Sequence, residues 1–294
     1  MCHWPSVRGA DVHAQGWSAV PIESVGGPDL AASLPAALAA ADTFFALPAD
    51  RKRGVLATDA NGYRGWEPPS IHGHASGTQE AKEGFVIGQE PAPGRSDPQV
   101  RRANPWPADV PSLRPALRQV RDRLQAVALA VLPAVEDAMT IPRGSLSDRA
   151  RDPMQALRVL RYPPTPAGQN PALGIGPHTD AGCLTLLWQA DEPGLEVQAV
   201  DGTWSVVAPD PAVLILSLGD MAALLSGGRV PALRHRVINR TRRTRHSIAF
   251  FLDLDPDGLI TPLRSRGSDG PAKGPTAPLT AAEMLAKMHE RDYR

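Results

Sequence analysis

The sequence lacks the features that mark several large classes of protein. Its 31 Lys and Arg residues balance 31 Asp and Glu residues, so no surplus of charge indicates a nucleic acid or a membrane surface as a partner. It has no run of about eighteen apolar residues and no apolar stretch at its N-terminus, so we expect neither a membrane span nor a secretory signal. Cys2 and Cys183 are too few for a disulfide framework, which favours a reducing cytoplasm as the location.

The 294 residues are enough for one large domain with a sizeable core, and the first half shows mainly helical patterns. Asp29 is placed to cap a helix with leucines at every fourth position, and the clearest helix is expected at 112–139. Short strands are expected at 17–22 and 82–87. Residues 58–79 are rich in Gly, Pro, His and aromatic residues, which is typical of a long functional loop.

The pattern changes to strands after residue 147. About seven or eight short apolar runs follow, separated by Gly, Pro and Asp turns, and this spacing predicts a sandwich or an open barrel. Thr280, with Glu283 three residues later, is a capping box that predicts a short C-terminal helix. We expect a single domain, residues 1–294, with a mainly helical portion at 1–147, a β core at 148–255 and a C-terminal segment at 256–294.

A candidate metal site lies in the strand-rich part of the chain. His178 and Asp180 are two residues apart, so in a strand both side chains would point to the same face. By itself this spacing is a weak signal, because most such pairs are surface residues. His235 lies in a second strand-like stretch and is a candidate third ligand. Two histidines and one carboxylate on one face of a metal form the facial triad of non-heme Fe(II) oxygenases.

A candidate carboxylate anchor follows His235 closely. Arg245 and Ser247 would share one face of a strand, and a guanidinium beside a hydroxyl is well suited to hold a carboxylate. Tyr162, at the end of another strand, is placed to add a phenolic hydrogen bond. A metal site and a carboxylate anchor so close in sequence are together far more specific than the His-x-Asp pair alone.

The segment from about residue 155 to 255 resembles the iron(II)- and 2-oxoglutarate-dependent oxygenases of the isopenicillin N synthase-like family. The resemblance rests on motifs that occur in the same order and at the same spacing. They are Tyr162-Pro163, His178-Thr179-Asp180, Leu184 to Leu187 with Gln189, Gly194 to Val197, Gly219-Asp220, His235-Arg236-Val237, and Arg245-His246-Ser247 before Phe250-Phe251. Weaker matches upstream, such as Gly62-Tyr63 and Lys82-Glu83, extend the resemblance over most of the chain.

The resemblance implies an α+β fold, with a double-stranded β-helix (jelly-roll) core flanked by N-terminal helices and a short C-terminal helix. It also implies roles for the residues already singled out: His178, Asp180 and His235 as catalytic iron ligands, and Arg245, Ser247 and Tyr162 as contacts to 2-oxoglutarate. Fe(II), 2-oxoglutarate and O2 would together oxidise a small molecule of secondary metabolism, by hydroxylation, desaturation or ring closure, with release of succinate. Leu160 stands where plant-type members have Asn, so one contact to 2-oxoglutarate is expected to be missing.

Other functions remain open from the sequence. An oxidase of the isopenicillin N synthase type would use the same iron ligands without 2-oxoglutarate, since its Arg and Ser hold the substrate instead. A non-catalytic metal-dependent sensor on the same fold is another alternative, whereas a zinc hydrolase lacks an evident general base. Substrate contacts are expected from Tyr63 and Arg64 in the long loop and from Phe85 and Ile87 in the strand after it, although core packing suits Phe85 and Ile87 equally well. No feature indicates the oligomeric state.

Overall fold

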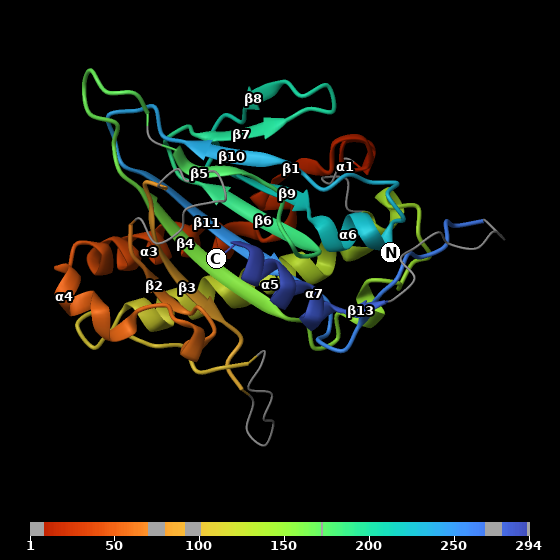
Figure 1. The fold of residues 1–294 in the computed structure, drawn as a ribbon, viewed down its shortest axis with the longest axis horizontal. Coiled ribbons are helices and arrows are strands. Elements are labelled where there is room, and N and C mark those ends of the chain that lie inside the picture. The colour runs from red at the N-terminus through yellow and green to blue at the C-terminus, as the bar shows by residue number, and fades with distance from the viewer. Residues whose placement is uncertain (1–8, 70–79, 92–100, 172, 268–277, 293–294) are drawn as a thin grey trace.

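Two β-sheets form the centre of the molecule, and helices cover one of them (Figure 1). The structure, a computed structural model, describes residues 9–69, 80–91, 101–171, 173–267 and 278–292. The major sheet has seven strands in the order β1-β9-β6-β11-β4-β3-β2, and the minor sheet has four in the order β5-β10-β7-β8. From β4 to β11 the chain crosses repeatedly between the two sheets. This connectivity confirms the predicted α+β fold with a jelly-roll core.

The elements have the following bounds. The strands are β1 (Trp17–Pro21), β2 (Gly65–Glu67), β3 (Glu83–Gly88), β4 (Gln155–Tyr162), β5 (Leu173–His178), β6 (Leu184–Gln189), β7 (Leu195–Gln198), β8 (Trp204–Val206), β9 (Val213–Leu218), β10 (His235–Ile238), β11 (Arg245–Leu252), β12 (Leu259–Ile260) and β13 (Leu279–Thr280). The helices are α1 (Gly9–Gln15), α2 (Ile22–Val25), α3 (Gly27–Phe45), α4 (Ala49–Lys52), α5 (Leu113–Ala138), α6 (Asp220–Leu225) and α7 (Ala281–Asp292).

Two hydrophobic cores hold these layers together. The larger core lies between the major sheet and the helices α3 and α5, where Leu117 and Leu124 of α5 and Phe250 of β11 are fully buried. Apolar residues at helical spacing on α5 explain why this helix lies along the sheet. The smaller core fills the space between the two sheets and consists of Leu160, Tyr162, Leu195, Ile215 and Val237. Polar residues are buried on the same strand faces, among them Gln189, Arg245 and Ser247.

Most of the expected elements are confirmed, and two expectations were wrong. Asp29 does not cap α3, because the helix begins at Gly27 with Gly26 as its N-cap and a proline in its first two positions, where a fixed φ favours a helix start. Asp29 lies in the first turn instead. The long loop at 58–79 is interrupted by β2, because this segment pairs with β3. The capping box of α7 is confirmed, since the Thr280 amide donates to Glu283 Oε2 over 2.8 Å and the Glu283 amide donates to Thr280 Oγ1 over 3.2 Å.

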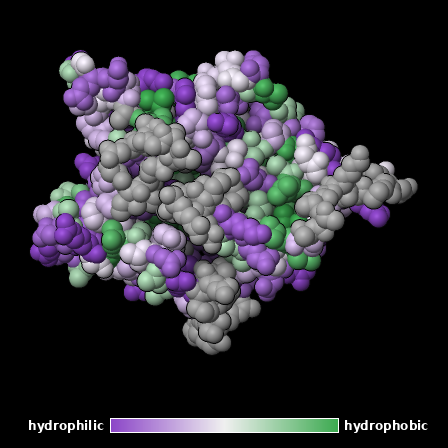
Figure 2. Space-filling model, in the orientation of Figure 1, coloured by the Kyte–Doolittle hydropathy of each residue, from purple (hydrophilic) through white to green (hydrophobic). Residues whose placement is uncertain are grey.

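The face of the molecule in Figure 2 is largely hydrophilic, with apolar residues gathered over the region of α6 and α7. Leu224 of α6 and Leu259 of β12 are partly exposed. Within the described residues, no single helix is long and apolar enough to cross a membrane. The sharply bent pair formed by Gly27–Phe45 and Ala49–Val55 meets this criterion only when the two helices are taken together, and in α3 the large apolar residues Leu30, Leu34, Phe44 and Phe45 are buried in the core.

Candidate active site

His178, Asp180 and His235 come together at one end of the minor sheet. His178 is the last residue of β5 and His235 is the first of β10, and the antiparallel register places these two directly opposite each other. Their rings are 4.2 Å apart, and Asp180 Oδ1 lies 3.7 Å from His178 Nε2 and 3.8 Å from His235 Nε2. The prediction that His178 and Asp180 share one strand was wrong, because β5 ends at His178 and Asp180 lies in the loop that follows. Within the described part of the chain, these three side chains form the group that could hold a metal ion.

Hydrogen bonds orient all three side chains. His178 Nδ1 lies 2.8 Å from the carbonyl oxygen of Gly176, and His235 Nδ1 lies 3.2 Å from that of Leu233. With a proton on each Nδ1, both Nε2 atoms present a lone pair toward Asp180. The hydroxyl of Thr185 in β6 donates to Asp180 Oδ2 over 2.6 Å, which leaves Oδ1 on the side of the two rings. The three inward atoms are therefore two imidazole nitrogens and one carboxylate oxygen, which suits Fe(II) with open positions left over.

The backbone at Asp180 is held just as firmly. The amide of Asp220 donates to the carbonyl oxygen of Asp180 over 2.8 Å, and the hydroxyl of Thr179 donates to Asp220 Oδ2 over 3.1 Å. A Cβ on Gly219 would lie 2.5 Å from the Asp180 carbonyl oxygen, so only glycine permits this close approach. The Gly219-Asp220 pair at the start of α6 thus fixes the turn that carries the carboxylate.

Asp253 is a titratable group near the cluster that the sequence did not reveal. It follows β11, is 7% exposed, and accepts the amide hydrogen of Cys183 on Oδ1 over 2.9 Å. Burial raises the pKa of Asp253 to about 7, the Cys183 hydrogen bond lowers it, and the nearby charge of Asp180 raises it further. Burial also raises the pKa of the Cys183 thiol, so this cysteine stays neutral and unreactive. Cys2, the other cysteine, lies outside the described residues.

Arg245 is fully buried in the interior of the jelly roll. Its guanidinium carbon lies 4.8 Å from the ring centre of Tyr162, the residue opposite it in the β4–β11 register. Its Nη2 donates to Gln189 Oε1 over 2.9 Å, but Nε and Nη1 have no hydrogen-bond partner of good geometry among the described residues. Burial lowers the pKa of Arg245, and the neighbouring Tyr162 hydroxyl partly opposes this. Burial likewise raises the pKa of Tyr162, against the charge of Arg245 and the Ser247 hydroxyl.

A buried cation with unpartnered donors requires an anion. Desolvation of an unpaired guanidinium costs several kcal/mol, which a carboxylate bound to it would offset. Ser247 lies two residues from Arg245 on the same strand face, as expected from the sequence, and is 1% exposed. The residues present therefore fit a ligand that carries a carboxylate at this depth.

The strand β6 links the anchor to the metal cluster. Thr185, which contacts Asp180, and Gln189, which contacts Arg245, are four residues apart on one face of β6. Four residues of strand span about 13 Å. Asp180 and Arg245 reach inward from the two ends of this span, and a small dicarboxylate fits between them. A ligand that coordinates a metal at one end and ends in a carboxylate at the other matches this spacing.

The residues expected to contact substrate do not all face this interior. Phe85 and Ile87 of β3 are fully buried in the larger core, on the helix side of the major sheet, where Phe85 packs 4.9 Å from the ring of Phe44. Tyr63 is half-buried, with a left-handed φ of 56°. Their roles as substrate contacts stay predictions.

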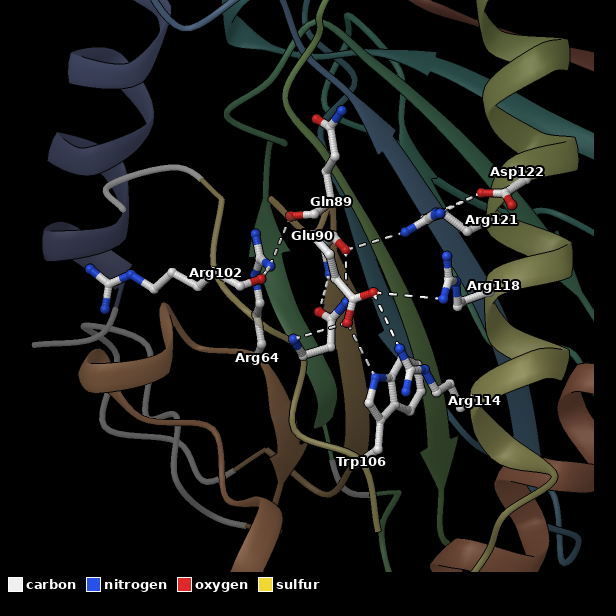
Figure 3. A network of polar contacts seen from close by, with 11 residues as sticks. Arg64, Gln89, Glu90, Arg102, Trp106, Arg114, Arg118, Arg121 and Asp122 are labelled. Atoms are coloured by element: carbon white, nitrogen blue, oxygen red, sulfur yellow. Dashed lines mark hydrogen bonds and ion pairs between the residues drawn. The ribbon is translucent and has the colours of Figure 1, made fainter. Parts of the chain in front are cut away.

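Arg64, the fourth expected contact, belongs to a polar network at one end of the major sheet (Figure 3). Its Nη1 donates to the backbone carbonyls of Gln89 and Arg102, and burial lowers its pKa to about 10. Glu90 is the acidic centre of this network, with Trp106 Nε1 3.3 Å away and Arg114 and Arg118 at its rim. Burial would raise the pKa of Glu90, but the hydrogen bonds from Trp106 and Asn104 and the two arginines lower it overall. In this setting Arg64 joins two backbone segments, and its role toward a substrate stays a prediction.

The opposite face of β3 and β4 carries residues that the sequence reasoning missed. Val86 and Arg158 are paired in register and share the strand face of Tyr162. Arg158 donates to both carboxylate oxygens of Glu67, over 2.8 and 2.7 Å. Strand alternation is the signal for this face, because Val86 stands between Phe85 and Ile87 and points to the opposite side.

Comparisons with known proteins agree with this geometry. A family model described as the 2OG-Fe(II) oxygenase superfamily matches residues 152–254, and one described as "non-haem dioxygenase in morphine synthesis N-terminal" matches residues 26–109. The 2-oxoglutarate-dependent dioxygenase citB of Monascus ruber is 34% identical over 79% of this chain and 74% of its own length. Clavatol oxidase claD of Penicillium crustosum is 33% identical over 77% of this chain and 73% of its own.

Solved structures show the same fold. A 2OG-Fe(II) oxygenase family protein from Caulobacter crescentus superimposes with a TM-score of 0.82 and 29% identity, covering 96% of this chain and 92% of that one. A full-length Neurospora crassa protein, solved with alpha-KG (2-oxoglutarate) and 5-formyluracil, superimposes with a TM-score of 0.79 at 23% identity, covering 94% of this chain and 86% of that one. The second likeness extends to the fold alone.

Proposed function

Because this chain belongs to the 2OG-Fe(II) oxygenase superfamily, and is thus an Fe(II)- and 2-oxoglutarate-dependent dioxygenase, we propose that His178, Asp180 and His235 are its iron ligands. Their inward nitrogen and oxygen atoms, and the hydrogen bonds that orient them, support this assignment. When bound, the iron supplies the oxygen-activating chemistry that converts 2-oxoglutarate into succinate and carbon dioxide and oxidises a small molecule. The protein residues supply the geometry and exclude water.

The 2-oxoglutarate contacts that we propose are Arg245, Ser247 and Tyr162. The observation that carries this proposal is the buried Arg245 guanidinium, whose Nε and Nη1 lack partners among the described residues. The distal carboxylate of 2-oxoglutarate would accept from these nitrogens and from the Ser247 hydroxyl, and it would offset the cost of burying the charge. The Tyr162 ring packs against the guanidinium and limits how far it can turn.

We further propose that all 294 residues form a single oxygenase domain and that its substrate is a small molecule met in the cytoplasm. The family model matches on both sides of α5 support one domain. Relatives and structural neighbours named for clavatol, or solved with thymine or with JA, support a small-molecule substrate. Succinate release with a panel of such compounds tests the substrate class, and cell fractionation tests the location.

The assignment of the anchor and the triad is tested by equilibrium binding without oxygen. We expect Arg245→Met to weaken 2-oxoglutarate binding by at least about 30-fold, because truncating one partner of a buried charge pair costs about 2–5 kcal/mol. Asp180→Ala should abolish metal binding and turnover. Arg143→Met, at an exposed ion pair with Asp137, is the matched control and should bind as the wild type does.

Two results would contradict the proposal. Wild-type affinity of Arg245→Met for 2-oxoglutarate would show that Arg245 is not the anchor. Metal-dependent turnover by Asp180→Ala would show that the three residues are not the iron ligands. Substrate oxidation without succinate would instead indicate chemistry of the isopenicillin N synthase type, in which the anchor holds the substrate.

A further inference from the structure

Gln189 is the residue that accepts a well-formed hydrogen bond from the buried guanidinium of Arg245. It is the last residue of β6, is 2% exposed, and lies opposite Ser247 in the β6–β11 register. Its Oε1 accepts from Arg245 Nη2 over 2.9 Å, while its Nε2 donates to the carbonyl oxygen of Val207 over 3.4 Å. The amide is therefore fixed from both ends, and its oxygen faces the guanidinium.

The side-chain partner of this buried cation is neutral. The other buried cations with short side-chain contacts pair with carboxylates: Lys52 with Glu83, Lys82 with Glu80, and Arg101 with Asp152. Arg245 is more deeply buried than any of them, yet it meets an amide. An amide oxygen accepts a hydrogen bond without cancelling charge, so the positive charge of Arg245 stays available to a ligand.

The walls around Arg245 are shaped to hold it in one position. A Cβ on Gly194 would lie 2.7 Å from Arg245 Cδ and 2.8 Å from Nε, so the side chain passes directly over this glycine. The Tyr162 ring lies 4.8 Å from the guanidinium carbon, and it fits there only because position 174 is a glycine, whose Cβ would come within 2.6 Å of Tyr162 Cδ1. The contact with Gly194 restricts the aliphatic part of the Arg245 side chain, and the contact with Tyr162 restricts the tilt of the guanidinium plane. Gln189 restricts the remaining freedom, rotation of the guanidinium within that plane.

We propose that Gln189 is a positioning residue that sets co-substrate selectivity. It ties down Nη2 of Arg245 without neutralising it, so that Nε and Nη1 present an uncompensated charge to the distal carboxylate of a 2-oxo dicarboxylic acid. This inference rests on the proposed function, because it takes Arg245 as the anchor. The ratio of affinities for 2-oxo acids with and without a distal carboxylate should therefore depend on the amide at position 189.

The test is equilibrium binding of two 2-oxo acids to the metal-loaded protein without oxygen. 2-Oxoglutarate has the distal carboxylate, and 2-oxopentanoate lacks it. In Gln189→Glu the new carboxylate would pair with Arg245, so we expect 2-oxoglutarate affinity to fall by at least about 30-fold. Affinity for 2-oxopentanoate and for the metal should be unchanged. Gln189→Met, of similar size but without an acceptor, should lose about 3- to 10-fold for 2-oxoglutarate, since the charge remains but its tether is gone.

Gln169→Glu, the same change at an exposed loop position, is the control and should match the wild type. In turnover assays the Gln189 variants should raise the KM for 2-oxoglutarate while leaving kcat within about twofold, a split that general loosening of the fold would not produce. Wild-type selectivity in Gln189→Glu overturns the inference. If that variant does not fold, Gln189→Met decides, and wild-type affinity in it overturns the inference too. Failure of the wild-type protein to bind 2-oxoglutarate is a separate outcome that overturns the proposed function itself.

Discussion

Replacing Thr185 by valine tests how the structure aims the metal-binding carboxylate. Valine has the same shape, and it removes only the hydroxyl that donates to Asp180 Oδ2 over 2.6 Å. Thr185 is 5% exposed, so water cannot readily replace the lost donor. The hydrogen bond involves a charged acceptor, for which about 1.5–3 kcal/mol is typical. Without it, Asp180 is free to turn Oδ1 away from the two histidines.

The expected loss of metal affinity follows from that energy. A loss of about 1.5–3 kcal/mol corresponds to roughly 13- to 160-fold in Kd, at about 1.36 kcal/mol per decade. The loss of a partner that orients a metal ligand typically costs a similar factor of about 10 to 100. An opposing effect exists, since a carboxylate without a donor is more negative and attracts a cation more strongly. Orientation should prevail, because a single oxygen has to meet two fixed imidazoles.

Calorimetric titration of the metal-free protein with Fe(II) under anaerobic conditions measures this effect. Thr43→Val is the matched control, because the Thr43 hydroxyl bonds to a carbonyl on the exposed side of α3, far along the chain from the site. An unchanged or tighter Kd in Thr185→Val would refute the reasoning. It would mean that charge on the carboxylate, and not its orientation, limits binding.

Two further predictions concern stability. Burial raises the pKa of Asp253 to about 7, above the value of about 3.9 in an unfolded chain, so the metal-free folded protein binds the extra proton. Its contribution to the free energy of unfolding is thus complete below about pH 4 and is lost as the pH rises through about 7, by up to about 1.4 kcal/mol per pH unit. Urea unfolding at a series of pH values should show that Asp253→Asn removes this slope. Phe85→Ala should lower the free energy of unfolding by about 3–5 kcal/mol with little change in 2-oxoglutarate affinity; a large change in affinity at full stability would place Phe85 in the site instead.

The sequence predicts the interior residues best where spacing alone determines the face of a strand. Arg245 and Ser247 are two residues apart, so they had to share a face, and β11 confirms it. The meeting of His178 with His235 could not be derived in this way. It depends on the pairing of β5 with β10, which lie far apart in the chain and have irregular register.

The strand β3 shows why the substrate face was harder to predict. Every residue of β3 except Val86 is buried, so hydrophobicity does not alternate between its two faces. The large apolar residues Phe85 and Ile87 were therefore predicted as substrate contacts, although they face the helices. The interior face of the strand carries Gly84, Val86 and Gly88, and the two glycines make room for the side chains of Glu67 and Arg64. Neutral residues such as Gln189 give no signal either, because their role depends entirely on the buried charge beside them.

The order of strands in the two sheets has a consequence for the behaviour of the protein at high concentration. Open sheet edges are templates for pairing with other chains, and within the described residues the edges here are poor templates. β2 and β8 are three residues long, and β1 ends in Pro21, which cannot donate a ladder hydrogen bond. On the edge strand β5, the Gly176 amide already donates to the carboxylate of Glu80 over 2.9 Å. Among the described residues, the two sheets that enclose the polar interior therefore present edges that are poorly suited to pairing with another chain.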